Sequence, residues 1–257
     1  MEKAQRPPLV VSEERGVRHL HVGGEAIQSA MRLSDPWALE LDYTRCMMSF
    51  LLFHPEPRRA LMIGLGGGSL AKFFHRRLPG LRTHVVEYDE RVIAAARSLF
   101  HVPGDDARLR VEHGDGVEAL APECCDLLVV DGFEDEAASP ALVSQAFFDA
   151  AWCALEAPGV LVMNFMDDDR ELDHHLRRLE QSFGGAVLAF HSLRDPNIVV
   201  LALKGGPAAV EWRTLRSRAD KLEKKYGLPF PRYVERLRTM NRWSAQALHV
   251  LPQEKEA

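Results

Sequence analysis

This chain of 257 residues has little of what marks a membrane, metal-binding or disulfide-stabilised protein. No apolar run approaches the roughly 20 residues that a helix needs to cross a bilayer, and the first residues lack the charged-then-apolar order of a signal peptide. The four cysteines lack the spacing of a metal site. We therefore expect free thiols, no metal and a cytoplasmic protein without a membrane partner. The cysteines are Cys46, Cys124, Cys125 and Cys153.

The chain also lacks an excess of basic residues. Its formal net charge is −5, which gives no support for a nucleic-acid partner. A hydrophobic content of 46% with 27% charged residues is instead typical of a globular protein. At this length, one main domain with small additions can bury a substantial core.

The most informative segment is residues 61–70, which read LMIGLGGGSL. An apolar run followed by a glycine cluster predicts a buried strand, a tight turn and a helix start, where the backbone can approach a ligand closely. The next predicted strand ends in a carboxylate, Glu87, 23 positions after the first glycine. That spacing is near the roughly 20 residues typical of an acid that holds ribose hydroxyls. The predicted nucleoside-binding residues are Gly64, Gly66, Gly67, Gly68 and Glu87.

The glycine cluster lacks the third glycine of a dinucleotide-binding motif, because Ser69 stands at that position. A pyrophosphate is therefore disfavoured. A nucleoside without phosphates, as in S-adenosylmethionine, needs the same turn and the same ribose acid. The alternative is that the glycines only form a tight corner between strand and helix.

Strands and helices are predicted to alternate through residues 59–203. This order implies a parallel sheet covered on both faces. The last two strands are separated only by residues 192–197, too few for a helical crossover, so they should form an antiparallel hairpin. The predicted fold is α/β, a Rossmann-like fold of the S-adenosylmethionine methyltransferase type. The strands are 60–63, 83–87, 109–113, 126–130, 159–164, 186–191 and 198–203, and the helices are 70–78, 90–100, 116–120, 144–155 and 170–183.

The two ends of the chain differ from this central part. Three short strands, 9–12, 17–22 and 25–32, are expected first, and then a helix over 37–53, with Asp35 as its N-cap and proline next. The tail, 210–250, reads as two amphipathic helices broken at 227–231. The expected division is 1–57 for the N-terminal β-strands and linking helix, 58–205 for the nucleoside-binding domain and 206–257 for the helical tail.

Two further carboxylates follow strands of the predicted sheet and should lie at its ligand-binding edge. Asp115, next to Gly116, could accept a hydrogen bond from an adenine amino group, or it could cap the following helix. Asp131 ends an apolar strand and is the candidate catalytic residue, unless it is a solvated turn residue. The acidic loop after it, with Glu134 and Asp135, could attract a cationic substrate or simply be solvated.

No serine or cysteine nucleophile with a positioned histidine is indicated. The chemistry suggested is direct displacement at a carbon activated by a sulfonium, which needs positioning and deprotonation of an amine. The acidic run 167–169 precedes a predicted helix and is interpreted as structural.

These motifs resemble the spermidine synthase (polyamine aminopropyltransferase) family from about residue 16 to residue 203. The resemblance implies that the matching residues bind decarboxylated S-adenosylmethionine and that Asp131 helps take the proton from an attacking amine. It also implies a small-molecule amine as partner, a small N-terminal β-domain and a homodimer. The matching segments are 23–28, which ends in Gln28, the residue Tyr43, the glycine loop 63–70, and 86–89, 114–116 and 129–131.

The chain departs from the family pattern at three places. The glycine loop has Gly66 where the family usually carries an aspartate for the aminopropyl amine. The segment at 43–45 reads Tyr-Thr-Arg, and residues 132–136 replace the family's Asp-Pro gate. These departures leave three functions open, namely aminopropyl transfer, methyl transfer from intact S-adenosylmethionine, and nucleoside binding without catalysis.

Overall fold

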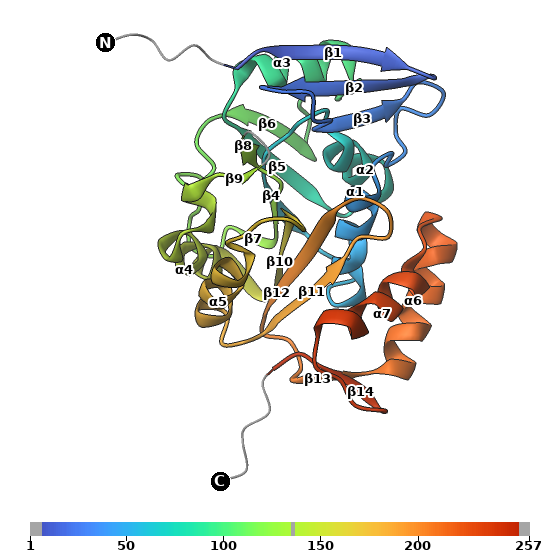
Figure 1. Ribbon diagram of the computed structural model, residues 1–257, viewed down its shortest axis with the longest axis vertical. Coiled ribbons are helices and arrows are strands. Elements are labelled where there is room, and N and C mark those ends of the chain that lie inside the picture. The colour runs from blue at the N-terminus through green and yellow to red at the C-terminus, as the bar shows by residue number, and fades with distance from the viewer. Residues whose placement is uncertain (1–6, 135–136, 252–257) are drawn as a thin grey trace.

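A seven-stranded sheet forms the centre of the protein, in the order β11-β12-β10-β7-β4-β5-β6 (Figure 1). The computed structural model describes residues 7–134 and 137–251. Strands β6, β5, β4, β7 and β10 run parallel, whereas β12 is antiparallel to both β10 and β11. The predicted fold is therefore confirmed, including its terminal hairpin. The strands are β4 (Arg59–Ile63), β5 (Arg82–Glu87), β6 (Leu109–His113), β7 (Cys125–Val130), β10 (Leu155–Met166), β11 (Val187–His191) and β12 (Asn197–Lys204).

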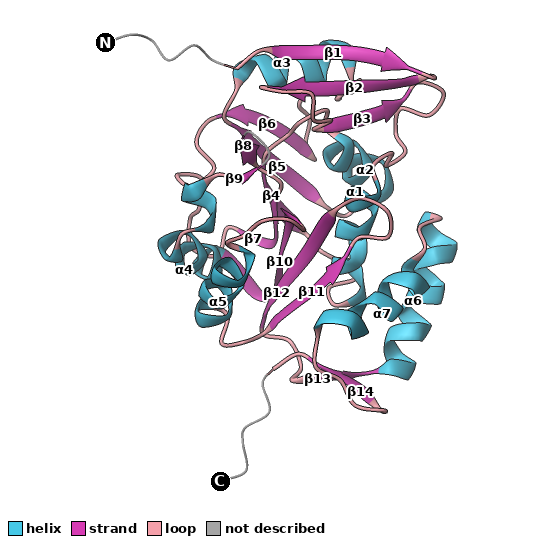
Figure 2. Cartoon of the chain, viewed as in Figure 1, coloured by secondary structure: helices cyan, strands magenta, loops and turns pink. Residues whose placement is uncertain are grey.

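Helices cover both faces of this sheet (Figure 2). Successive residues of a strand alternate between the faces, so Met62 belongs to one buried cluster while Leu61 and Ile63 belong to the other. The cluster with Met62 includes residues of α1, η1, α2, α3, α6 and α7, and the second includes residues of η2, α4 and α5. These helices are α1 (Asp42–Met47), the 3₁₀ helix η1 (Met48–Leu52), α2 (Ser69–Arg77), α3 (Glu90–Leu99), η2 (Pro140–Val143), α4 (Gln145–Ala154), α5 (Leu172–Ser182), α6 (Trp212–Tyr226) and α7 (Phe230–Met240).

A separate antiparallel sheet lies at the N-terminal end, with β1 (Leu9–Glu14), β2 (Val17–Val22) and β3 (Ser29–Arg32) in order. The edge strand β3 contacts α2, and its first three residues are buried. This arrangement agrees with the small N-terminal β-region expected from the sequence. Two minor pairs, β8 (Phe133–Glu134) with β9 (Ala137–Ala138) and β13 (Ala209–Glu211) with β14 (Ala247–His249), were not expected.

The two tail helices form as expected and are separated at Gly227, whose left-handed φ of 72° ends α6. They pack on each other and, through α7, on β11. In the part of the chain that the structure describes, no helix combines the length and the apolar character needed to cross a bilayer.

Three local predictions were wrong. The helix expected over 37–53 begins only at Asp42 and continues as a 3₁₀ helix, because Asp35 accepts the amide of Trp37 in a turn and does not cap a helix. Residues 116–119 form a turn and not a helix, and their backbone lies directly against β4, since a side chain at Gly116 would lie 2.3 Å from a methyl of Ile63. The third N-terminal strand starts at Ser29, after residues 25 and 26 have turned their carbonyls toward a histidine ring of β2.

Candidate active site

The candidate residues gather at one edge of the sheet because the carboxyl ends of parallel strands lie together. Backbone hydrogen bonds join neighbouring strand ends in turn. The amide of Asp131, after β7, donates to the carbonyl of Ile63 at 3.0 Å, and the amide of Gly64, after β4, donates to Val86 at 2.9 Å. The amide of Gly114 then donates to Glu87 at 3.0 Å. The motifs that are separated in the sequence therefore lie on adjacent loops along one edge of the sheet.

The glycine loop is tied to the loop of the candidate catalytic acid. Gly64 has a φ of +92°, and a Cβ there would lie 2.4 Å from the carbonyl oxygen of Asp131, so only glycine fits. Further along, a Cβ at Gly67 would meet the hydroxyl of Ser29 at 2.7 Å. A Cβ at Gly68 would meet Val102 at 2.2 Å. These glycines are therefore required by packing within the protein as well as by any ligand, which keeps the tight-corner interpretation as part of the explanation.

The predicted ribose acid, Glu87, lies at the end of β5 and is half-buried. Its Oε2 accepts the amide of Leu65 at 2.8 Å and its Oε1 accepts the amide of Asp89 at 2.9 Å. Burial raises the pKa of Glu87, while the amides of Asp89 and Leu65 act in the opposite direction. Glu87 thus holds the glycine loop, where the amide of Gly66 also acts on it, and a carboxylate with about four accepting positions keeps capacity for a further donor.

Asp115 caps its own turn. The side chain is exposed, and its Oδ1 accepts the amide of Val117 at 2.8 Å. The capping alternative raised by the sequence is therefore present, although the capped element is a turn and not a helix. A role for Asp115 and Gly116 toward an adenine stays a prediction.

Asp131 is the centre of the site. Tyr43 donates its hydroxyl to Oδ2 of Asp131 at 3.2 Å, and Asn164 donates Nδ2 to Oδ1 at 3.2 Å. Burial raises the pKa of Asp131 to about 6, against the lowering effect of these two hydrogen bonds. Burial and the charge of Asp131 raise the pKa of Tyr43 well above its usual 10, so the phenol stays protonated. A carboxylate with this pKa can accept a proton near neutral pH.

Two residues of this network were missed at the level of sequence. Asn164 lies near the end of β10, and Asn197 is the first residue of β12. Both are buried, and Nδ2 of Asn197 donates to Oδ1 of Asn164 at 3.0 Å. The signal that could have found Asn164 is a lone amide inside the apolar run 160–165, because a buried polar side chain needs a partner.

Tyr43 and Gln28 reach the site from the N-terminal part of the chain. The hydroxyl of Tyr43 also lies 3.4 Å from the backbone carbonyl of Gln28. The side-chain amide of Gln28 donates to Val22 at 3.4 Å. The structure therefore brings Gln28 near Asp131 through its backbone, and its part in cofactor binding stays a prediction.

The acidic loop after Asp131 is only partly described. Glu134 belongs to β8, and Asp135 lies outside the described residues. The second acidic run ends in Asp169, whose Oδ1 accepts the amide of Glu171 at 2.9 Å and whose Oδ2 lies 3.5 Å from His175. Within residues 7–134 and 137–251, no group of three metal-ligating side chains comes together, and the four cysteines are unpaired.

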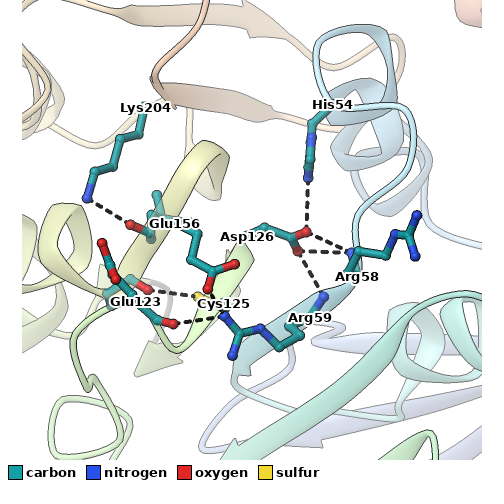
Figure 3. Close-up of polar contacts among 10 residues, drawn as sticks. His54, Arg58, Arg59, Glu123, Cys125, Asp126, Glu156 and Lys204 are labelled. Atoms are coloured by element: carbon teal, nitrogen blue, oxygen red, sulfur yellow. Dashed lines mark hydrogen bonds and ion pairs between the residues drawn. The ribbon is translucent and has the colours of Figure 1, made fainter.

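The opposite edge of the sheet carries a different polar cluster (Figure 3). Asp126, near the start of β7, accepts the amides of Arg58 at 2.8 Å and Arg59 at 2.9 Å, and His54 lies 3.4 Å away. Burial opposes ionisation, but the nearby His54 and the hydrogen bonds from the two amides hold the pKa of Asp126 below its usual value. This cluster joins β4 to β7 and lies at the far end of those strands from Asp131.

A structural comparison fits this arrangement. A probable spermidine synthase from Corynebacterium glutamicum superposes with a TM-score of 0.70, at 20% identity, over 86% of this chain and 85% of that one. Human methyltransferase-like protein 13, solved in complex with SAH, superposes with a TM-score of 0.64, at 23% identity, over 80% and 96% of the two chains. At these identities the likeness establishes the shared fold.

Sequence comparison goes further. Residues 40–187, which include Tyr43, the glycine loop, Asp131 and Asn164, match the spermine/spermidine synthase domain. A polyamine aminopropyltransferase of Chromobacterium violaceum is 37% identical over 241 residues, which are 93% of this chain and 92% of the relative. The resemblance noted in the sequence is confirmed, and the chain belongs to the spermine/spermidine synthase family.

Proposed function

We propose that this protein transfers an aminopropyl group from decarboxylated S-adenosylmethionine to a small amine, with a polyamine as the expected class of acceptor. Membership of the family supports the reaction type, as does the name of the relative that covers almost the whole chain. The observation that carries the proposal is Asp131, a carboxylate with a raised pKa at the ligand-binding edge of the sheet, held by Tyr43 and Asn164.

In this proposal the adenosine lies over the glycine corner. The backbone at Gly64, Gly66, Gly67 and Gly68 leaves room for close approach, and Glu87 accepts the ribose hydroxyls. Gly68 stands at the N-cap of α2 and has no side chain to accept the amides of the first turn, so these amides are proposed to face the ligand. Asp115 and Gly116 would border the adenine, and Gln28 would close the site from the N-terminal side.

The chemistry follows from the position of the base. The nitrogen of the acceptor amine attacks the aminopropyl carbon next to the sulfonium. The carbon–sulfur bond breaks, methylthioadenosine leaves, and the amine loses a proton to the carboxylate of Asp131. Tyr43 keeps its own proton and holds that carboxylate in place, so the reaction depends on orientation and proton removal without a covalent enzyme intermediate. Glu134 and Asp135 are proposed to attract the cationic acceptor.

Methyl transfer from intact S-adenosylmethionine is the second candidate, and one observation favours it. Gly66 stands where the family usually has an aspartate. Because glycine carries no charge, a ligand that keeps its carboxylate would meet no opposing charge from residue 66. A Cβ at this position would be 3.6 Å from Cβ of Ser29. The fold shared with a methyltransferase-like protein is compatible with either reaction.

Calorimetric titration with S-adenosylmethionine, its decarboxylated form and methylthioadenosine separates these functions when it is combined with a turnover assay on a panel of amines. We expect preferential binding of the decarboxylated form and release of methylthioadenosine only when an amine is present. Preference for intact S-adenosylmethionine with formation of a methylated amine would replace the first proposal by the second. Binding without consumption of any amine would indicate a nucleoside-binding protein that lacks catalysis.

A further inference from the structure

Both hydrogen-bond donors of Asp131 have a partner in the same short segment, the 192–197 turn, which comprises residues 192–196 between β11 and β12 and the first residue of β12, Asn197. Asn197 donates to Oδ1 of Asn164 at 3.0 Å. The carboxylate of Asp195 accepts the backbone amide of Tyr43 at 3.0 Å. A single turn, distant in sequence from the glycine loop, therefore contacts each residue that holds the proposed base.

The turn is itself closely held against α1. Within it, the backbone amide of Ser192 donates to the backbone carbonyl of Asn197 at 2.8 Å. The backbone amide of Asn197 donates to the backbone carbonyl of Asp195 at 2.8 Å. From α1, Oδ2 of Asp42 accepts the amides of Leu193 at 2.7 Å and Arg194 at 2.9 Å. The contact is reciprocal: a carboxylate of the turn accepts an amide of the helix, and a carboxylate of the helix accepts two amides of the turn.

Asn197 decides which way the amide of Asn164 points. A side-chain amide has one accepting end and one donating end. Nδ2 of Asn197 can only donate, so it favours Oδ1 of Asn164 on its own side and leaves Nδ2 of Asn164 toward Asp131. The reversed amide would place two NH₂ groups face to face and set its oxygen against the carboxylate. Both asparagines are buried, so water is poorly placed to compensate for that mismatch.

Asp195 acts on the second donor. Its contact with the amide of Tyr43 lies in the first turn of α1, where the N-cap residue Leu41 provides no side-chain acceptor. An acceptor at this position satisfies an orphan amide and sets where the short helix begins. The ring of Tyr43 projects from that turn, so the place of its hydroxyl depends on the same contact.

We propose that the 192–197 turn is the positioning element of the base, with Asn197 acting on Asp131 through Asn164 and Asp195 acting through Tyr43. The inference rests on the proposed role of Asp131 as the proton acceptor. Asn197 and Asp195 are positioning residues and need no contact with the substrates. The titratable side chains of this network in the described chain are Asp131, Tyr43, Asp195 and Asp42, with Cys46 behind Asp42.

The test is the variant Asn197→Leu, which removes the donor at similar size and without adding charge. The pKa of Asp131 is followed by carbon-13 NMR of labelled aspartate, assigned with Asp131→Asn, and kcat and KM are measured in parallel. We expect the pKa of Asp131 to rise by about one pH unit, as for an ionised group that loses one hydrogen bond. We expect kcat near neutral pH to fall about tenfold, with KM for the nucleoside little changed.

Asn241→Leu is the matched control. Asn241 bonds the backbone of Ala189 on β11 through both ends of its amide, so this variant disturbs the same hairpin without touching the network of Asp131. It should lower stability and leave the pKa of Asp131 unchanged. In an Asn164→Ala background, Asn197→Leu should have no further effect on that pKa, because the intermediary is gone.

A second pair of variants covers the case in which Asn197→Leu does not fold. Asp195→Ala should also raise the pKa of Asp131, and Asp195→Asn, whose carbonyl oxygen can still accept the amide of Tyr43, should restore it. An unchanged pKa in both Asn197→Leu and Asp195→Ala, or an equal rise with Asn164→Ala present, overturns the inference. A wild-type protein without transferase activity would tell against the proposed function alone, since the NMR titration needs no turnover.

Discussion

At the scale of single residues, Asp131 combines the energetic cost of a buried carboxylate with its proposed role as proton acceptor. It accepts hydrogen bonds from neutral donors, a phenol and an amide, and within the described residues no cation contacts it. Neutral donors offset part of the cost of burial while leaving the pKa high enough for proton transfer. This balance distinguishes it from Asp126 on the same strand, whose two amides and histidine keep the pKa low.

The first prediction concerns turnover. Asp131→Asn keeps the shape of the side chain and removes the proton acceptor, so kcat should fall by about 10²- to 10⁴-fold, the usual contribution of a general base. Nucleoside binding, measured by calorimetry, should stay within a few-fold of wild type. Asp149→Asn, an exposed change on α4, serves as the control. Turnover equal to wild type would remove Asp131 from the proposed mechanism.

The same variant should change how stability depends on pH. The pKa of folded Asp131 is raised from the usual 3.8 to about 6. Its stabilising contribution is therefore fully present below the lower value and is lost as the pH rises through the upper one. Near pH 8, Asp131→Asn should thus unfold at higher urea than wild type. Its free energy of unfolding should be larger by about 1–2 kcal/mol after allowance for partial exposure. Near pH 4 the two proteins should be close, and an equal difference at both pH values would contradict the raised pKa.

Glu87 carries the third prediction. Glu87→Ala removes the proposed ribose acceptor and also the acceptor of the Leu65 and Asp89 amides. Affinity for S-adenosylmethionine-type nucleosides should fall at least about tenfold, because a hydrogen bond to a charged group is worth about 1.5–3 kcal/mol. Glu112→Ala on the adjacent strand β6 is the control for a lost carboxylate. Calorimetry that finds equal affinity in Glu87→Ala would exclude Glu87 from the nucleoside site.

At the scale of elements, the site depends on how closely the end of β4 approaches the end of β7. The two strands pair in parallel up to Ile63 and Val130, and the next residues, Gly64 and Asp131, continue as touching loops. The proposed catalytic carboxylate and the proposed nucleoside-binding loop are therefore in direct contact, and a change at Gly64 should displace Asp131.

Gly64→Ala tests this coupling. Its Cβ would meet the carbonyl of Asp131 at 2.4 Å, and alanine disfavours a φ of +92°. We expect loss of both nucleoside binding and turnover, with a stability decrease of about 1–3 kcal/mol. Gly104→Ala is the control, since a Cβ there meets nothing within 4 Å. Normal activity in Gly64→Ala would mean that the two loops move independently.

At the scale of the whole molecule, one buried cluster joins all three parts of the chain. Leu20 of β2, Val85 of β5 and Leu237 of α7 belong to it, and each is fully buried. We propose that the segments 1–57, 58–205 and 206–257 are parts of one cooperative structure with a shared core. The tail helices then stabilise the sheet that carries Asp131.

A core truncation in the tail tests that proposal. Leu237→Ala should destabilise the protein by about 2–5 kcal/mol, as for other buried leucines. Circular dichroism follows the whole fold, and fluorescence of a nucleoside analogue follows the site. Both should report the same lowered midpoint of unfolding. If the tail melted separately while the nucleoside site kept its wild-type midpoint, the tail would be an independent domain.

Much of this protein could be predicted from local sequence. The alternation of strand-like and helical segments predicted every strand of the main sheet, and the short 192–197 segment required a hairpin there. The glycine loop, Glu87 and Asp131 were proposed as site residues because strand ends carry ligand residues in parallel sheets, and the structure brings these strand ends together. These features depend on backbone geometry over a few residues, and the identities of those same residues determine that geometry.

The partners of Asp131 were decided only by tertiary structure. Asn164 lies 33 residues from it, and the contact of Asp195 with Tyr43 spans 152 positions. The start of α1 was predicted wrongly for the same reason, because its acceptor comes from a distant turn and not from Asp35. Local patterns encode which elements form, whereas hydrogen bonds between distant side chains exist only once packing has excluded water and set donors opposite acceptors.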